Sequence, residues 1–120
     1  MNSVEDRLSQ LSIVLPQPVA PVANYVPFVQ SSGGMVHISG QISTDASGGI
    51  KGVVGEAVDL ATAVRAARLC GINLIAQMKA ACGGDLSRIK RVVKLGGFVQ
   101  AGPDFFDIPK VINGASDLMV

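Results

Sequence analysis

The stretch AVDLATAVRAARLCGINLIAQMKAAC, residues 57–82, decides the fold. Its apolar residues recur every three or four positions, the period of an α-helix with one buried face. The predicted buried stripe comprises Leu60, Val64, Ala67, Gly71, Leu74 or Ile75, and Met78. A glycine weakens a helix by about 1 kcal/mol relative to alanine, so we expect Gly71 to permit a close approach to the sheet. Gly83 and Gly84 are expected to end the helix.

The residues before this helix predict β-strands. Residues 24–32 and 35–42 read as two strands joined by a tight turn at Gly33 and Gly34. In the second strand Val36, Ile38 and Ile42 alternate with a more polar set, which comprises Met35, His37, Ser39 and Gln41. One face therefore packs on a core and the other is more polar. Residues 44–49 are expected to form a loop and residues 50–54 a short third strand.

The residues after the helix predict one more strand and one more helix. Residues 89–99 alternate as a strand does, and residues 105–120 read as a helix that begins in earnest near Pro109. The element order is strand, strand, strand, helix, strand, helix. This order predicts an α+β domain in which a mixed sheet is covered on one face by two helices.

Composition restricts the class of protein. A chain of 120 residues suffices for one compact domain, and 48% hydrophobic residues argue against disorder. A net charge of +1 gives no general electrostatic case for binding nucleic acid or an anionic membrane. No apolar run reaches the roughly 18 residues of a membrane span, and residues 1–10 do not resemble a signal peptide. We expect a cytoplasmic protein without membrane association.

Residues 1–22 are predicted to form an extended N-terminal arm. It holds a short amphipathic stretch with Val4, Leu8 and Leu11, after which Pro16, Pro18 and Pro21 exclude a helix. Cys70 and Cys82 lie twelve positions apart in the predicted helix, about 18 Å at 1.5 Å per residue, which is beyond disulfide reach. Both are expected to be reduced core residues.

Several stretches together resemble the Rid (reactive intermediate deaminase) family, also called YjgF-like or endoribonuclease L-PSP. They are PVANYVPF at 21–28, VHISGQI at 36–42, the helix with AAR at 66–68, Asn73, Leu74 and Gln77, the strand 89–99, and residues 104–116. Their order and spacing make the match specific, and it extends from about residue 15 onward. The resemblance implies a Rid-like domain over residues 23–120.

Family membership implies a chorismate-mutase-like fold and a homotrimer with ligand sites in clefts between subunits. Deaminating members hydrolyse reactive enamines and imines, such as 2-aminoacrylate, to a 2-keto acid and ammonia, without a metal or organic cofactor. The polar strand face with His37, Ser39 and Gln41 is what the trimer would use. By the same resemblance Tyr25, Ser39, Gly40 and, as a weaker match, Asn113 bind a small carboxylated ligand.

The family's carboxylate-binding arginine and supporting glutamate lie in its last two strands, which would follow Val120. The domain is therefore expected to be incomplete at its C-terminal end, and no catalytic residue can be named within it. Arg65, Arg68, Arg88 and Arg91 are at the wrong positions to replace the arginine.

Two other functions remain open at this point. One is a non-catalytic trimeric protein that binds small ligands. The other is an endoribonuclease or translation inhibitor, which the absence of a basic stripe disfavours. His37 is the only histidine, and nothing else supports a catalytic triad or a zinc site around it. Residues 49–55 are rich in glycine but lack both phosphate-loop patterns.

Overall fold

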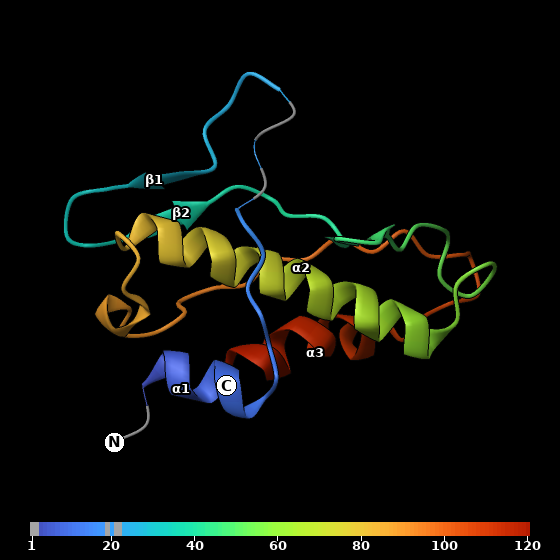
Figure 1. The fold of residues 1–120 in the computed structure, drawn as a ribbon. Helices are drawn as coiled ribbons and strands as arrows, with labels where there is room; N and C mark the ends of the chain where they lie inside the picture. The colour runs from blue at the N-terminus through green and yellow to red at the C-terminus, as the bar shows by residue number, and fades with distance from the viewer. Residues whose placement is uncertain (1–2, 19, 21–22) are drawn as a thin grey trace. The chain divides into compact units, whose positions relative to one another are not determined.

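The computed structural model describes residues 3–18, 20 and 23–120, and it confirms an α+β chain (Figure 1). The elements in chain order are α1 (Val4–Gln10), β1 (Phe28–Gln30), β2 (Val36–Ile38), β3 (Thr44–Asp45), β4 (Gly48–Gly49), α2 (Leu60–Ala81), the 3₁₀ helix η1 (Leu86–Arg88) and α3 (Ile108–Met119). Contacts divide the chain into two compact units. One comprises Met1–Gly40 with Asn73–Arg91, and the other comprises Gln41–Ile72 with Val92–Val120. Helix α2 contributes to both.

The first unit contains the predicted hairpin. β1 and β2 pair antiparallel, with Phe28 opposite Ile38. Gly33 and Gly34 both have positive φ, as a tight turn between the strands requires. The paired strands are shorter than the predicted ranges, and Pro27 gives the reason at one end, because it has no backbone N–H to donate to the ladder.

Three hydrogen bonds to backbone carbonyls cap the C-terminal end of α2 within this unit. The side-chain amide of Gln30 on β1 donates to the Ala81 carbonyl at 2.9 Å. The Arg88 guanidinium donates to the Cys82 carbonyl at 3.3 Å. Gly84 adopts positive φ and donates its N–H to the Lys79 carbonyl, so the predicted helix stop is confirmed. These bonds satisfy carbonyl groups that a helix end otherwise leaves without a partner.

Helix α1 lies in the predicted N-terminal arm and packs against η1. Ser3 and Asp6 form a capping box at its start. Leu8 of α1 and Leu86 of η1 are both buried. Glu5 pairs with Lys79 of α2 at 3.4 Å, although both side chains are partly exposed and such pairs contribute little. Apolar burial therefore holds α1 in place. The boundary between arm and domain near residue 22 stays a prediction.

The second unit is built around a small aliphatic core of Val54, Val58, Ala63 and Val111. Partly buried side chains pack against this core: Leu60, Ala67, Val99 and Phe105. Val54 forms a parallel bridge with Ala101: its N–H donates to the Gln100 carbonyl, and its carbonyl accepts from Gly102, both at 2.9 Å. The predicted third strand is thus reduced to isolated bridges at Val54, with Ala101 and with Val58, and the predicted loop at 44–49 instead contains the hairpin β3–β4.

The predicted strand at 89–99 forms no ladder, which corrects the sequence-based expectation. A strand is stable only when a neighbour accepts its N–H groups and donates to its carbonyls. In the described part of the chain, the backbone hydrogen bonds to Val54 come from residues 100–102, which follow the predicted strand. Phe98 is fully exposed. Among the described residues, the expected mixed sheet is represented by two antiparallel hairpins and two isolated parallel bridges, both at Val54.

In the second unit α3 packs closely against the N-terminal half of α2 (Figure 1). Pro109 stands in the first turn of α3, as predicted. Gly71 approaches Ala115 and Leu118, so its predicted close contact is with a helix and not with the sheet. Gly114 comes closer still, because a Cβ there would collide with the backbone oxygen of Val64.

The burial of α2 differs from the predicted stripe. Most stripe positions are half-buried, and the most buried side chains include Ala63, Ala76 and two polar residues, Asn73 at 3% and Gln77 at 1% exposure. Both residues take part in interactions within the fold. Periodicity counts apolar residues alone and could not have found them.

Asp59 directly precedes α2, and the stability of the protein should depend on the charge of its carboxylate. Its carboxylate accepts from the Thr62 N–H at 2.8 Å, and this bonding holds the pKa of Asp59 below its ordinary value of 3.8. Stability from a lowered carboxyl pKa is present above the unfolded pKa and is lost as the pH falls through the folded pKa. We therefore expect Asp59→Asn to remove a small stabilisation at pH 7 that wild type itself loses below about pH 4.

The check is chemical denaturation of both proteins from pH 7 to 3. The two stability curves should converge at the acid end. Curves that stay parallel throughout would contradict a role for the Asp59 charge.

Candidate ligand-binding site

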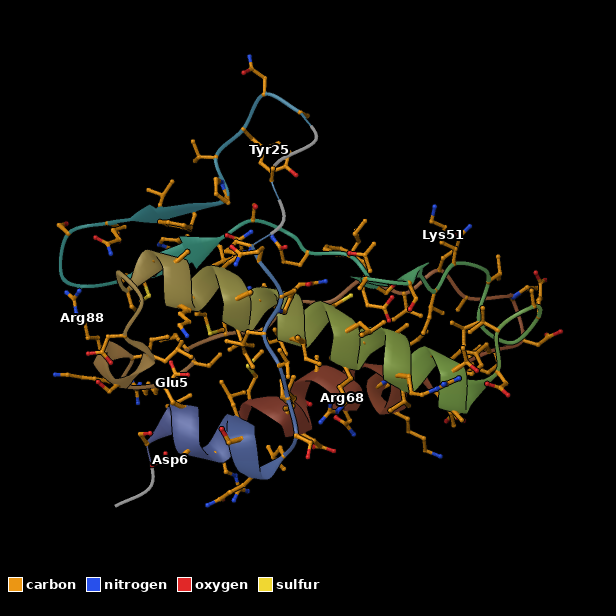
Figure 2. All side chains as sticks on the ribbon, in the orientation of Figure 1. Glu5, Asp6, Tyr25, Lys51, Arg68 and Arg88 are labelled. Carbon is orange, nitrogen blue, oxygen red and sulfur yellow. The ribbon has the colours of Figure 1, made fainter. Side chains whose placement is uncertain are left out.

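The residues singled out by the sequence gather mainly in the first unit. Tyr25 lies on the loop that leads into β1, as Figure 2 shows, and its side chain is 46% exposed. The Tyr25 N–H donates to the Ala23 carbonyl at 2.9 Å within a bend. Because half of the ring faces solvent, packing alone does not fix its direction. The phenol is available to donate or accept a hydrogen bond to a ligand.

Ser39 immediately follows β2 and bonds back to the start of β1. Its backbone N–H donates to the Pro27 carbonyl at 2.9 Å, and its hydroxyl donates to the same oxygen at 3.1 Å. The side chain is half-buried. Ser39 therefore ties the chain two residues beyond Tyr25 to the end of β2.

Gly40 offers an approach to the backbone. No heavy atom lies within 4 Å of the position that a Cβ would occupy on this residue. A small molecule can therefore contact the main chain directly, which a side chain at this position would hinder. Tyr25, Ser39 and Gly40 thus lie on the strand end and loop of one unit.

Asn113 lies in the other unit, on the exposed side of α3. Its side-chain oxygen accepts a bond from the Ser116 hydroxyl at 3.2 Å, one turn further along the helix. That local bond orients the amide, and Asn113 is described within its own unit only.

The remaining candidates give no separate reactive centre. His37 is exposed on β2, opposite Val29. Cys70 and Cys82 are unpaired and half-buried instead of core residues, and burial raises the pKa of the Cys70 thiol, which makes it a poorer nucleophile. Among residues 3–18, 20 and 23–120, no three His, Cys, Asp or Glu side chains converge as metal ligands would.

Sequence reasoning missed Pro27, whose carbonyl is the acceptor for both Ser39 bonds. The proline signals only that the residue opposite it lacks one backbone donor, and which residue lies opposite depends on the register of the two strands. In the described part of the chain, no helix is long and apolar enough to cross a bilayer.

The element order of the described residues, with two antiparallel hairpins and two longer helices, defines a class of small α+β proteins by fold alone. The comparisons give the family. Residues 5–120 match the family described as "YjgF/chorismate mutase-like, putative endoribonuclease". The chain belongs to this family, which confirms the resemblance and the chorismate-mutase-like fold.

Similar proteins come from a protozoan and from bacteria. Protein TCP17 of Trypanosoma cruzi is 43% identical over 118 residues, covering 98% of this chain and 72% of the relative. The crystal structure of Atu1372 from Agrobacterium tumefaciens is 49% identical with a TM-score of 0.84, covering 95% of this chain and 70% of that one. A "putative endoribonuclease" from Shewanella oneidensis MR-1 is 35% identical with a TM-score of 0.92, covering 98% and 77%.

Proposed function

We propose that this protein hydrolyses small, reactive enamines and imines that carry a carboxylate, of which 2-aminoacrylate is the type. The enamine tautomerises to the imine, water adds to the imine carbon, and the resulting carbinolamine expels ammonia to leave a 2-keto acid. The observation that carries the proposal is the pair of hydrogen bonds from Ser39 to the Pro27 carbonyl, which hold the Tyr25 loop beside the end of β2, in a chain that belongs to this family.

The residues named here would bind and orient the substrate. The Tyr25 phenol would donate to a substrate oxygen, and the open backbone at Gly40 would let the planar substrate lie against the strand. Neither group is a nucleophile, because water is the attacking species. In deaminating members of the family an arginine grips the substrate carboxylate, because the planar guanidinium suits a planar carboxylate.

The proposal includes a cytoplasmic homotrimer with the ligand site in a cleft between subunits. Apolar side chains on this chain would be covered by such an assembly. They include Val29 on β1 and Val93 and Phe98 on the segment that forms no ladder, all of which are exposed in the single chain. An unpaired strand segment is also an open template for pairing with another strand.

Tyr25 provides the first test of the proposed activity. Freshly generated 2-aminoacrylate is supplied to the full-length protein, and the keto acid is measured against the uncatalysed rate. We expect Tyr25→Phe to lower kcat/KM roughly tenfold, because a hydrogen bond to a charged group contributes about 1.5 kcal/mol or more.

Val14→Ala is the control, since Val14 is an exposed side chain remote in sequence from the site. The trimer mass of each variant is checked first by sedimentation equilibrium. Wild-type protein that fails to accelerate keto acid release, despite forming a trimer, would remove the main support for the proposal. Saturable carboxylate binding without turnover would then favour the non-catalytic alternative.

Cleavage of RNA is the second candidate, favoured by the printed descriptions of the family and of the Shewanella protein. Arg88, Lys90, Arg91 and Lys94 give the sequence one short basic run, although the net charge of the 120 residues is only +1. Ribonuclease activity that stays proportional to this protein through repeated purification would support this candidate. Activity that separates from it would eliminate the candidate.

A further inference from the structure

We propose that Ser39 is a positioning residue whose hydroxyl bond to Pro27 fixes the Tyr25 loop relative to the open backbone at Gly40. This inference deepens the proposed function and rests on it for its catalytic consequence. The claim that the Ser39 hydroxyl bond fixes the Tyr25 loop can be tested even if the protein shows no enzymatic turnover.

The bond pattern of the hairpin gives the first step. Along β1 and β2, hydrogen-bonded and non-bonded pairs alternate, and Pro27 stands opposite Ser39 at a bonded position. Two residues at such a position normally exchange two bonds. Pro27 has no N–H, so only the bond from the Ser39 N–H to the Pro27 carbonyl forms. The Ser39 hydroxyl adds a second bond to that same carbonyl at 3.1 Å.

The second step connects Tyr25 with the two hydrogen bonds from Ser39 to the Pro27 carbonyl, which we call the clamp. One residue, Val26, separates Tyr25 from Pro27, and a residue before proline is confined to extended conformations. Val26 and Pro27 therefore form a short, stiff link. The Tyr25 ring is 46% exposed, so its direction depends on the backbone that carries it. Movement of Pro27 away from β2 would carry Tyr25 with it.

The third step concerns the ligand side. Gly40 follows Ser39 directly, and the space over it is open to 4 Å. The clamp therefore joins the two elements that a ligand would contact together, the Tyr25 phenol and the Gly40 main chain. Without the hydroxyl bond, the loop would sample displaced positions, and the ligand would bind a smaller fraction of competent protein.

The hairpin contains a matched control at its other end. Ser31 also donates both its N–H, at 2.8 Å, and its hydroxyl, at 3.4 Å, to one carbonyl, that of Met35. Ser31→Ala thus removes the same kind of bond from the same hairpin without touching the loop. Ser39→Ala removes the clamp hydroxyl but keeps the backbone bond. Ser39→Thr keeps a hydroxyl on a residue suited to strands.

The experiment labels the full-length protein with 3-fluorotyrosine and follows ¹⁹F NMR, with the Tyr25 signal assigned by its loss in Tyr25→Phe. In Ser39→Ala we expect the Tyr25 signal to shift, and its broadening by a soluble gadolinium chelate to rise up to about twofold, since the ring is already half exposed. Ser39→Thr and Ser31→Ala should resemble wild type. Circular dichroism and thermal melting confirm that each variant is folded.

Kinetics supply the second readout. We expect Ser39→Ala to raise KM roughly three- to tenfold with kcat changed less than about twofold, the result of losing one hydrogen bond that selects a binding-competent loop. An unchanged Tyr25 signal in Ser39→Ala would overturn the proposal, as would the same change in Ser31→Ala or Ser39→Thr. If the Tyr25 ¹⁹F signal changes only in Ser39→Ala but the wild-type protein shows no turnover, the positioning role of Ser39 is supported and the proposed function is rejected.

Discussion

Replacing Gly114 by alanine should destabilise the full-length protein by about 2 kcal/mol net, although alanine is the better helix former. The added Cβ would collide with the Val64 backbone oxygen, where α3 crosses α2. A side chain could rotate away, but a carbonyl held in a helix cannot, so the helices must separate. Overpacking of this kind costs up to about 3 kcal/mol, and helix propensity returns about 1 kcal/mol.

The measurement is chemical denaturation at one fixed protein concentration, because assembly makes apparent stability depend on concentration. Two glycine variants calibrate it. Gly96→Ala meets no heavy atom within 4 Å and should change stability little. The added Cβ of Gly71→Ala would meet the end of the Leu118 side chain at 3.0 Å, a group that can shift. The loss of stability in this variant should lie between those of Gly96→Ala and Gly114→Ala. A Gly114→Ala protein more stable than wild type would refute the close α2–α3 contact.

Replacing Leu86 by alanine should destabilise the protein by about 3 kcal/mol, the usual range for a fully buried leucine being about 2–5 kcal/mol. Leu86 is 1% exposed and is among the largest fully buried side chains of the described residues. It belongs to η1, which packs against α1. The cavity left by the alanine would lie where the N-terminal helix joins the unit, so α1 should loosen first.

Unfolding monitored by circular dichroism measures the loss, and hydrogen exchange locates it in α1. Leu11→Ala is the matched control, because Leu11 is also a leucine beside α1 but is 44% exposed. It should cost about 1 kcal/mol or less, as surface changes do. Equal losses in the two variants would mean that Leu86 is not buried as described.

Helices α2 and α3 could be predicted closely from the sequence, whereas α1 lies in the segment predicted to be an extended arm. The apolar period and the two glycines at 83 and 84 predicted a helix at 57–82, and α2 spans Leu60–Ala81. Asp59 explains the later start, because its carboxylate accepts the Thr62 N–H. Pro109 likewise marked the first turn of α3. A helix satisfies its backbone within one segment, so local sequence suffices to specify it.

The site could be predicted only in part. Tyr25, Ser39 and Gly40 were singled out by resemblance to the family, and their roles as ligand contacts stay predictions. The two hydrogen bonds from Ser39 to the Pro27 carbonyl could not be predicted from the residues alone, because they depend on which residue lies opposite the proline. Register is a property of two strands and is set by their turn and by what they bury.

By itself the sequence determined the class of the chain, the two longer helices α2 and α3 and the hairpin turn, because each depends on residues within a few positions of one another. Only the tertiary structure decided that residues 89–99 form no ladder within the chain, that Gly114 meets Val64, and that Asn73 and Gln77 are buried. A strand, a helix crossing and a buried amide each need a partner from elsewhere in the fold. That partner's position is fixed by packing of the whole unit, and no local pattern encodes it.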